Sequence, residues 1–181
     1  TLYMVLALAA TDITRIFLPA IKPYGFSLSL GAVACLLAYG YFNYKHPDIN
    51  RIDITLDKPL PGKPMKIVAI SDVHLGNGTR KPQLKKFVEM INAQNPDLII
   101  ISGDLIDNSI LPLYQQKMAE ELSQLKAPMG IYMAPGNHEY ISGIEACESF
   151  LKDTPIQLLR DSIVTLPNGL QIIGRDDRAN R

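Results

Sequence analysis

The sequence has few of the residues that mark a disulfide-linked or a nucleic-acid-binding protein. Among 181 residues there are two cysteines, Cys35 and Cys147, with no Cys-x-x-Cys or Cys/His spacing. We expect them to be unrelated thiols. Eighteen basic and eighteen acidic residues give a net charge of zero, and no basic stripe with interleaved aromatic residues is present. A nucleic-acid partner is therefore not expected, and a nuclease is a disfavoured alternative.

Histidine is scarce, and its distribution is uneven. The chain has three histidines, His46, His74 and His138, and none follows His138. If His74 and His138 belong to a metal centre, no later histidine in the sequence can serve as a further ligand. The chain also begins with Thr1 and ends at Arg181 within a charged segment, so we expect it to be part of a longer protein.

Charge is missing from one long segment, Pro23 to Tyr44. A helix of this length can cross about 30 Å of hydrocarbon, and the tyrosines near its end are typical of a membrane interface. A signal peptide is the alternative, but an Ala-x-Ala cleavage pattern is absent. We expect residues 23–44 to form a transmembrane helix. Residues 1–22, with Asp12 and Arg15 one turn apart, are expected to hold the end of an earlier membrane segment and a loop.

The positive charges predict on which side of the membrane the rest of the chain lies. Basic residues after the apolar segment outnumber those in the loop before it, Lys22 with Arg15 nearby. They are Lys45, Arg51, Lys58, Lys63 and Lys66. Because positively charged loops stay in the cytoplasm, we expect a multi-pass protein of the cell membrane whose following domain lies on the cytoplasmic face.

Residues 45–64 are predicted to be a linker that leads into an edge strand. Ile52, Ile54 and Leu56 alternate with polar residues, as in a strand with one buried face. Several prolines and a glycine then break the pattern. From residue 65 to residue 181 the pattern alternates between strand and helix, which is typical of an α/β domain with a parallel sheet.

Three polar clusters follow apolar runs in this second part. Residues 66–71 lead into Asp72-Val73-His74, residues 98–102 into Gly103-Asp104 with Asp107 beyond, and residues 131–135 into Gly136-Asn137-His138-Glu139. The clusters lie about thirty residues apart, the length of a βαβ unit. Since parallel strands present their carboxyl ends at one edge of a sheet, we expect Asp72, Asp104 and Asn137 to meet there.

The segments around these clusters predict helices and a hairpin. Two apolar stripes have helical spacing, one with Leu84, Phe87, Val88 and Ile91, the other with Tyr114, Met118, Leu122 and Leu125. A third helix is predicted at residues 144–151. Residues 163–166 and 170–173 flank Pro167-Asn168-Gly169, which is typical of a β-hairpin.

The clusters supply the side chains of a polynuclear metal centre. Asp72 and His74 can hold one cation together, and the two oxygens of Asp104 can bridge ions about 3.5–4 Å apart. Asn137 offers a neutral carbonyl oxygen as a further ligand. His138, next to it, would face the substrate and donate a proton to a leaving oxygen. The sequence alone therefore predicts a metal-assisted hydrolytic site.

Taken together, Asp72-x-His74, Gly103-Asp104-x-x-Asp107 and Gly136-Asn137-His138-Glu139 resemble the motifs of the calcineurin-like metallophosphoesterase superfamily. The resemblance covers Met65 to about Arg181. The membrane segments and Gly174-Arg175-Asp176-Asp177 after the hairpin resemble its membrane-anchored bacterial branch. This implies a layered α/β/β/α sandwich with two divalent metal ions (Mn, Fe or Zn) that hydrolyse phosphate esters by means of a bridging hydroxide.

The resemblance also implies roles for single residues. Asp72 and His74 would bind the first metal and Asn137 the second, with Asp104 as the bridge between them. His138 would steady or protonate the leaving group. Asp107 matches an acid that orients its neighbours, and Arg175 is expected either to add positive charge near the phosphate or to pair with Asp176 or Asp177.

One part of the family pattern has no match in the chain. The family has a lone His and a Gly-His-x-His motif in its C-terminal half, whereas no His follows His138. We therefore assign the activity to the parent protein and expect these 181 residues, without the C-terminal half of the fold, to be inactive alone. The alternative is a non-catalytic membrane scaffold or regulator. For the parent protein we expect a phosphate-ester substrate, and a site beside a bilayer favours a phospholipid or a nucleotide-lipid.

Overall fold

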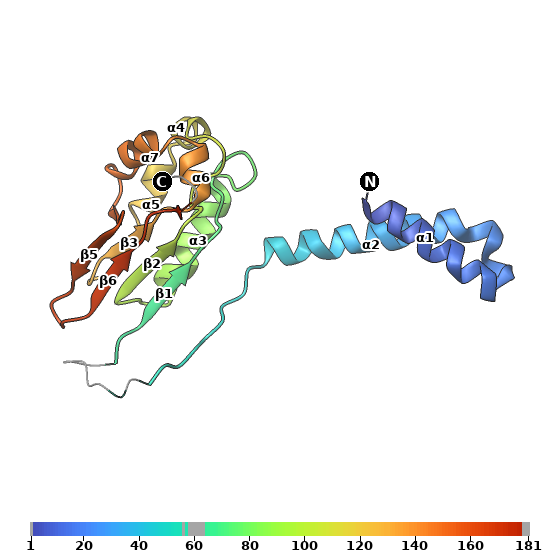
Figure 1. Cartoon of the computed structure of the whole chain (residues 1–181), viewed down its shortest axis with the longest axis horizontal. Coiled ribbons are helices and arrows are strands. Elements are labelled where there is room, and N and C mark those ends of the chain that lie inside the picture. Colours follow the sequence, from blue (N-terminus) through green and yellow to red (C-terminus); the bar gives the residue numbers. More distant parts are fainter. Residues whose placement is uncertain (1, 56, 58–63, 179–181) are drawn as a thin grey trace. The chain divides into compact units, whose positions relative to one another are not determined.

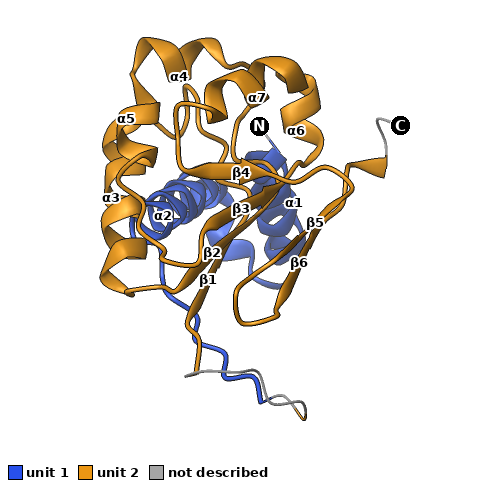
Figure 2. Cartoon of the chain, turned by 90° about the vertical axis from the view of Figure 1, so that its left-hand side faces the viewer, with its two compact units in different colours: residues 1–56 blue, residues 57–181 orange. Residues whose placement is uncertain are grey.

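The chain folds into two compact units, which Figure 2 distinguishes by colour. A computed structural model describes residues 2–55, 57 and 64–178. The first unit is Thr1–Leu56 and the second is Asp57–Arg181. The boundary between them falls inside the predicted linker, and the site-bearing residues all belong to the second unit.

The first unit is a helical hairpin. Helix α1 (Leu2–Phe17) is followed by a 3-10 helix, η1 (Pro19–Tyr24), and by helix α2 (Gly25–Lys45) (Figure 1). The hydroxyl groups of Thr11 and Ser29 lie 3.1 Å apart and join the two α-helices. One turn later in α1 and one turn earlier in α2, the guanidinium group of Arg15 packs against Gly25. The absence of a side chain at Gly25 leaves room for this guanidinium group between the two helices.

The predicted membrane helix at residues 23–44 falls within one continuous helical stretch. Among the described residues, Pro19–Lys45 is the single helix that is long and apolar enough to cross a membrane. Most of its large apolar side chains are exposed to the surroundings. Helix α1 has 16 residues, so an earlier membrane segment at residues 1–22 stays a prediction.

The predicted edge strand at Ile52–Leu56 is not formed in the part of it that the structure describes. Residues 46–55 contain no strand, and Leu56 lies outside the described residues. Ile52 and Ile54 are 80% and 78% exposed. The alternation of Ile with polar residues would bury one face only if a neighbouring strand paired with the backbone, and none of the described strands does so.

The second unit is built on a parallel sheet of four strands, which confirms the predicted α/β class. The strands are β1 (Ile67–Ile70), β2 (Leu98–Ser102), β3 (Ile131–Ala134) and β4 (Ile156–Leu158). Their order in the sheet is β1-β2-β3-β4. Ile70 pairs with Ile101 and Ser102 with Ala134, so the carboxyl ends of the first three strands lie at one edge. The short strand β4 was not predicted.

Helices cover one face of this sheet and a hairpin covers the other (Figure 2). The helices are α3 (Lys81–Ala93), α4 (Leu111–Gln115), α5 (Met118–Leu122), α6 (Asn137–Ile141) and α7 (Ile144–Leu151). The antiparallel hairpin consists of β5 (Ser162–Thr165) and β6 (Gln171–Gly174). Ile99 and Ile101 point into the core under the helices, whereas Leu98 belongs to the core under the hairpin. The predicted α3, α7 and hairpin are thus confirmed.

The predicted second helix, with its stripe from Tyr114 to Leu125, is wrong in its continuity. It is split into α4 and α5, and Lys117 between them has a left-handed φ of 51°. Leu113 and Met118 are both fully buried, although they would point about 140° apart on an unbroken helix. The break allows both side chains to reach the same core.

Candidate metal centre

The loops after β1 and β2 run side by side at the carboxyl edge of the sheet. The backbone N–H of His74 donates to the carbonyl of Asp104 at 3.0 Å, and that of Leu75 donates to Leu105 at 2.8 Å. The third loop, after β3, is tied to the second because the backbone N–H of His138 donates to Oδ1 of Asp104 at 3.0 Å. The arrangement that the βαβ spacing predicts, with the three polar clusters at one edge, is present.

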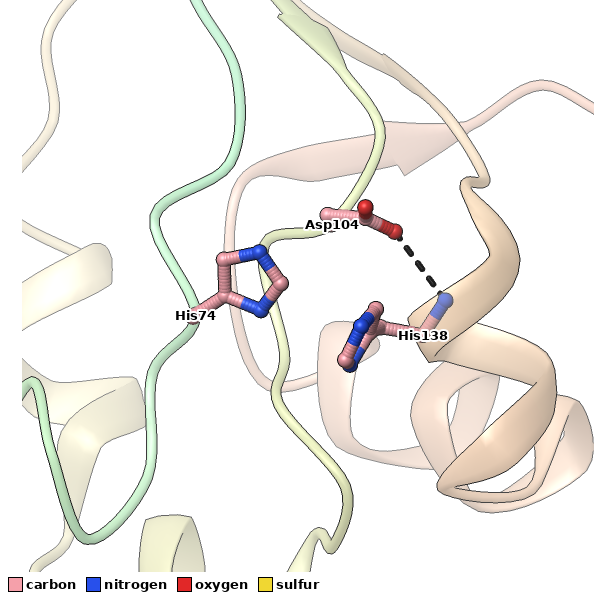
Figure 3. A group of neighbouring side chains, drawn as sticks. All are labelled: His74, Asp104 and His138. Carbon is pink, nitrogen blue, oxygen red and sulfur yellow. Dashed lines mark hydrogen bonds between the residues drawn. The ribbon is translucent and has the colours of Figure 1, made fainter. Parts of the chain in front are cut away.

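Three of these side chains form a group that fits a metal ion. One ligand atom from each of His74, Asp104 and His138 lies within 4.8 Å of the others, and all three residues are partly buried (Figure 3). The centroids of the two imidazole rings are 4.4 Å apart, and the rings are nearly perpendicular. Nδ1 of His138 is buried and has no hydrogen-bond partner. Imidazole and carboxylate together suit Zn, Mn or Fe, so the donor set fits a divalent cation.

Asp107 lies between the two histidines. Its Oδ1 is 3.6 Å from Nδ1 of His74 and 3.4 Å from Nδ1 of His138, and it accepts a hydrogen bond from the Asn108 amide at 3.0 Å. A carboxylate beside the ring nitrogens of two candidate ligands is placed to orient both rings. This is the position that the predicted orienting role of Asp107 requires.

The group of three contains neither of the other two predicted ligands. The carboxylate of Asp72 is 4.0 Å from Nε2 of His74, and its side chain is 67% exposed. Asn137 is the first residue of α6, next to His138, and is exposed. The roles assigned to Asp72, His74, Asp104 and Asn137 as ligands, and to His138 as proton donor, stay predictions.

The backbone at the site is held in an uncommon conformation. Asp72, His74 and Asp104 have φ values of 54°, 48° and 52°, in the left-handed region that costs energy for residues other than glycine. The hydrogen bonds between the first two loops oppose this cost. Three positive φ values at the ends of adjacent strands are typical of a functional site rather than of ordinary turns.

Glu139 holds the loops together, a role that sequence reasoning missed. Its side chain is fully buried, and Oε2 accepts from the backbone N–H of Asp104 at 2.9 Å and of Gly136 at 2.8 Å. Oε1 accepts from Ile106 at 3.0 Å. The signal was present in the sequence, because an acid three residues after a helix N-cap commonly bonds back to the cap N–H.

Gly136 is required by a close approach of the second and third loops. A Cβ atom at this position would overlap with the carboxylate of Asp104 and would lie 2.8 Å from its backbone nitrogen. We therefore expect Gly136→Ala to displace Asp104 and to weaken Mn²⁺ binding by the full-length protein on the order of tenfold or more. Isothermal titration measures this. Gly78→Ala, which puts a Cβ into open space, should bind Mn²⁺ as the wild type does, and equal binding by both variants would contradict the role of Gly136.

A second polar cluster, which we call the Tyr140 cluster, lies beside the candidate metal centre and joins α6 to the base of the hairpin. It consists of Tyr140, Glu148, Arg160 and Asp176. The hydroxyl of Tyr140 donates a short hydrogen bond to Asp176. Arg160 donates to Asp176 at 3.1 Å, to Glu148 at 2.9 Å and to the hydroxyl oxygen of Tyr140 at 3.1 Å. Arg175 pairs with Asp161 at 3.3 Å, whereas the sequence suggested Asp176 or Asp177 as its partner.

The Tyr140 cluster shifts the pKa values of its members. Partial burial alone would raise the pKa of Asp176, but the hydrogen bonds from Tyr140, the backbone of Asp177 and Arg160 together lower it. Asp176 in turn raises the pKa of the Tyr140 hydroxyl. Glu148 is the main cause of the raised pKa of Arg160. All three shifts favour the same state, with Tyr140 protonated and the carboxylate and guanidinium charged.

The lowered pKa of Asp176 predicts an acid-dependent stability. A carboxylate with a depressed folded-state pKa stabilises the fold above its unfolded pKa of about 3.9, and this contribution is lost as the pH falls through the lower folded-state value. We expect the wild type to be more stable than Asp176→Asn at pH 6 and the difference to shrink below about pH 4. Urea unfolding at several pH values measures it. A difference that stays constant down to pH 3 would contradict this assignment.

Comparison with known proteins agrees with this geometry. Residues 65–177 match the family described as calcineurin-like phosphoesterases, and the chain belongs to that family. It is 34% identical over 151 residues to a protein of Helicobacter pylori named an uncharacterized metallophosphoesterase, covering 81% of this chain and 40% of that protein. It is also 34% identical over 138 residues to a zebrafish protein named a transmembrane protein with metallophosphoesterase domain, covering 75% of this chain and 31% of that protein. The chain thus spans less than half the length of these two relatives.

Proposed function

We propose that the protein is a metal-dependent phosphoric ester hydrolase, anchored in a membrane, whose active site includes the candidate metal centre. The grouping of His74, Asp104 and His138 at the carboxyl edge of the parallel sheet carries this proposal. Membership of the calcineurin-like phosphoesterase family supports it. The proposal concerns the whole protein.

Each side chain has a role that its position supports. Asp72, His74, Asp104 and Asn137 would hold two divalent ions (Mn, Fe or Zn), which supply Lewis acidity and lower the pKa of water. Asp107 orients the imidazole rings beside it. His138 donates a proton to the leaving oxygen, and its partly buried ring is held next to Asp104 by the hydrogen bond from its own backbone N–H.

The proposed activity is tested on the full-length protein in detergent. With Mn²⁺ present it should hydrolyse an aryl phosphodiester, and a chelator should abolish the reaction, with activity restored by added metal. Hydrolysis that is unaffected by chelation, or no hydrolysis with any of the three metals, would contradict the proposal. Comparison of Mn²⁺, Fe²⁺ and Zn²⁺ in the same assay identifies the metal that supports turnover best.

We propose further that the substrate is lipid-linked, a phospholipid or a nucleotide-lipid. The support is the candidate membrane helix at Pro19–Lys45, which precedes the phosphoesterase domain in the chain. Detergent-solubilised protein should then have a higher kcat/KM on phosphodiesters or pyrophosphates that carry acyl chains than on soluble analogues with the same headgroup. A preference for the soluble analogues would remove this part of the proposal.

The membrane topology is a separate part of the proposal. The apolar α2 and its contacts with α1 through Thr11 and Ser29 support two helices that insert as a hairpin. The protein should remain in the membrane after an alkaline carbonate wash. In inverted vesicles, the phosphoesterase domain should be accessible to protease if it lies on the cytoplasmic face. Protection of the domain in inverted vesicles would contradict the predicted orientation.

The 181 residues by themselves are proposed to be inactive. The support is that no histidine follows His138 in the sequence, whereas the family pattern has further imidazole ligands. A non-catalytic membrane scaffold or regulator is the alternative that this observation favours. Hydrolysis by the full-length protein together with none by residues 1–181 supports the first reading, and a full-length protein without activity supports the second.

A further inference from the structure

Helix α6 is too short to fix its own orientation. It comprises five residues, Asn137–Ile141, and isolated helices below about 12–15 residues are marginal in water. Yet it carries both Asn137 and His138, so its orientation decides where two of the predicted site residues lie. The orientation of α6 must therefore be fixed by its contacts with the rest of the second unit.

The first turn of α6 is anchored toward the loop after β2. Glu139 accepts from the backbone of Asp104 and of Ile106, and the His138 N–H donates to Asp104. At the other end, Ile141 is 57% exposed, and Ser142, which follows it, lies with its hydroxyl oxygen 3.0 Å from the sulfur of Cys147 on α7. An attachment on a second side would limit any tilt of α6 about its first turn.

The Tyr140 cluster provides that second attachment. Its members come from four elements: Tyr140 from α6, Glu148 from α7, Arg160 from the loop after β4, and Asp176 from the segment after β6. The carboxylate of Asp176 is only 14% exposed. It is bonded by both Tyr140 and Arg160, and Arg160 lies over the Tyr140 ring at 5.7 Å. Hydrogen bonds to a charged carboxylate are stronger than those between neutral groups, so they restrain the geometry of the groups that they join.

We propose that Tyr140 and Asp176 are positioning residues. The bond between them holds α6 against the segment after β6 and thereby fixes Asn137 and His138 in the candidate metal centre. The inference rests on the proposed function where turnover is concerned, but its effect on metal binding does not require a substrate.

The variants Tyr140→Phe and Asp176→Ala of the full-length protein test this. Each removes one side of the same hydrogen bond. We expect Mn²⁺ affinity, measured by electron paramagnetic resonance, to fall on the order of tenfold in each variant, and kcat for the aryl phosphodiester to fall with little change in KM. The double variant should lose no more than either single one, because the interaction is already absent.

Tyr114→Phe is the matched control. It also removes a tyrosine hydroxyl from the same unit, and its ring packs edge-on against Phe150 at 5.4 Å. It should bind Mn²⁺ and turn over as the wild type does. Since Tyr140→Phe removes a single oxygen atom, it should stay folded even if Asp176→Ala is less stable.

Two results would overturn the inference. One is wild-type Mn²⁺ affinity and kcat in Tyr140→Phe, and the other is an equal loss in Tyr114→Phe, which would indicate general loosening of the unit. If the wild type hydrolyses no phosphate ester, the proposed function fails, but the Mn²⁺ titrations still decide whether Tyr140 and Asp176 position the site.

Discussion

Asp104→Asn is expected to abolish phosphate-ester hydrolysis by the full-length protein. We expect kcat to fall at least about a thousandfold, which corresponds to about 4 kcal/mol of transition-state stabilisation. Asp104 is the one carboxylate in the group with His74 and His138. Asn keeps the shape and one oxygen, so it still accepts the hydrogen bond from the His138 backbone, but it loses the charge and the second oxygen that a bridge between two ions needs.

The same variant should bind Mn²⁺ weakly while staying folded. Circular dichroism and Mn²⁺ titration separate the two effects. Asp153→Asn makes the same chemical change at an exposed position of the same unit and should keep wild-type activity. If Asp104→Asn kept more than a tenth of the wild-type kcat, a bridging role for this carboxylate would be wrong.

Glu139→Gln is expected to destabilise the second unit by about 2–4 kcal/mol. The carboxylate of Glu139 accepts from three backbone N–H groups, those of Asp104, Ile106 and Gly136. The amide NH₂ of Gln cannot accept, so at least one buried N–H loses its partner and faces another donor. Because these bonds join the loops after β2 and β3, Mn²⁺ affinity should fall as well. Urea unfolding measures the stability, and titration measures the affinity.

Glu145→Gln is the control for this change. Glu145 is exposed, on α7, and its replacement should alter the free energy of unfolding by less than about 0.5 kcal/mol. Equal stability of Glu139→Gln and the wild type would show that the three N–H groups find other acceptors, and the assigned role of Glu139 would then be lost.

Most of the second unit could be predicted because the apolar residues of each helix or strand recur with a single, regular spacing. Helix α3 has an unbroken apolar stripe, and α7 and the hairpin are bounded by turn residues. The elements that were missed are those in which tertiary packing decides. Strand β4 has three residues with one of them buried, and the break at Lys117 exists because Leu113 and Met118 both fill the core. At Ile52 and Ile54 the opposite is found: the residues alternate as in a strand, but none of the described strands pairs with them.

The site could be predicted at the level of its elements but not of its contacts. Parallel strands at βαβ spacing bring Asp72, Asp104 and Asn137 to one edge, and this follows from sequence order alone. The left-handed backbone at Asp72, His74 and Asp104 depends on hydrogen bonds between loops, and the sequence signal is weak because Asp and His adopt this conformation more often than most residues but still uncommonly. The position of Asp107 between the two rings and the three bonds of Glu139 also depend on contacts across the chain.

Diffraction from crystals of the full-length protein grown with Mn²⁺, recorded at the manganese absorption edge, would locate the metal ions relative to Asp104 and His74. We expect anomalous scattering within about 2.0–2.3 Å of a carboxylate oxygen of Asp104 and of a nitrogen of His74. A second peak should lie on the other side of Asp104, toward Asn137. Manganese bound elsewhere, with Asp104 and His74 making no metal contact, would contradict this expectation.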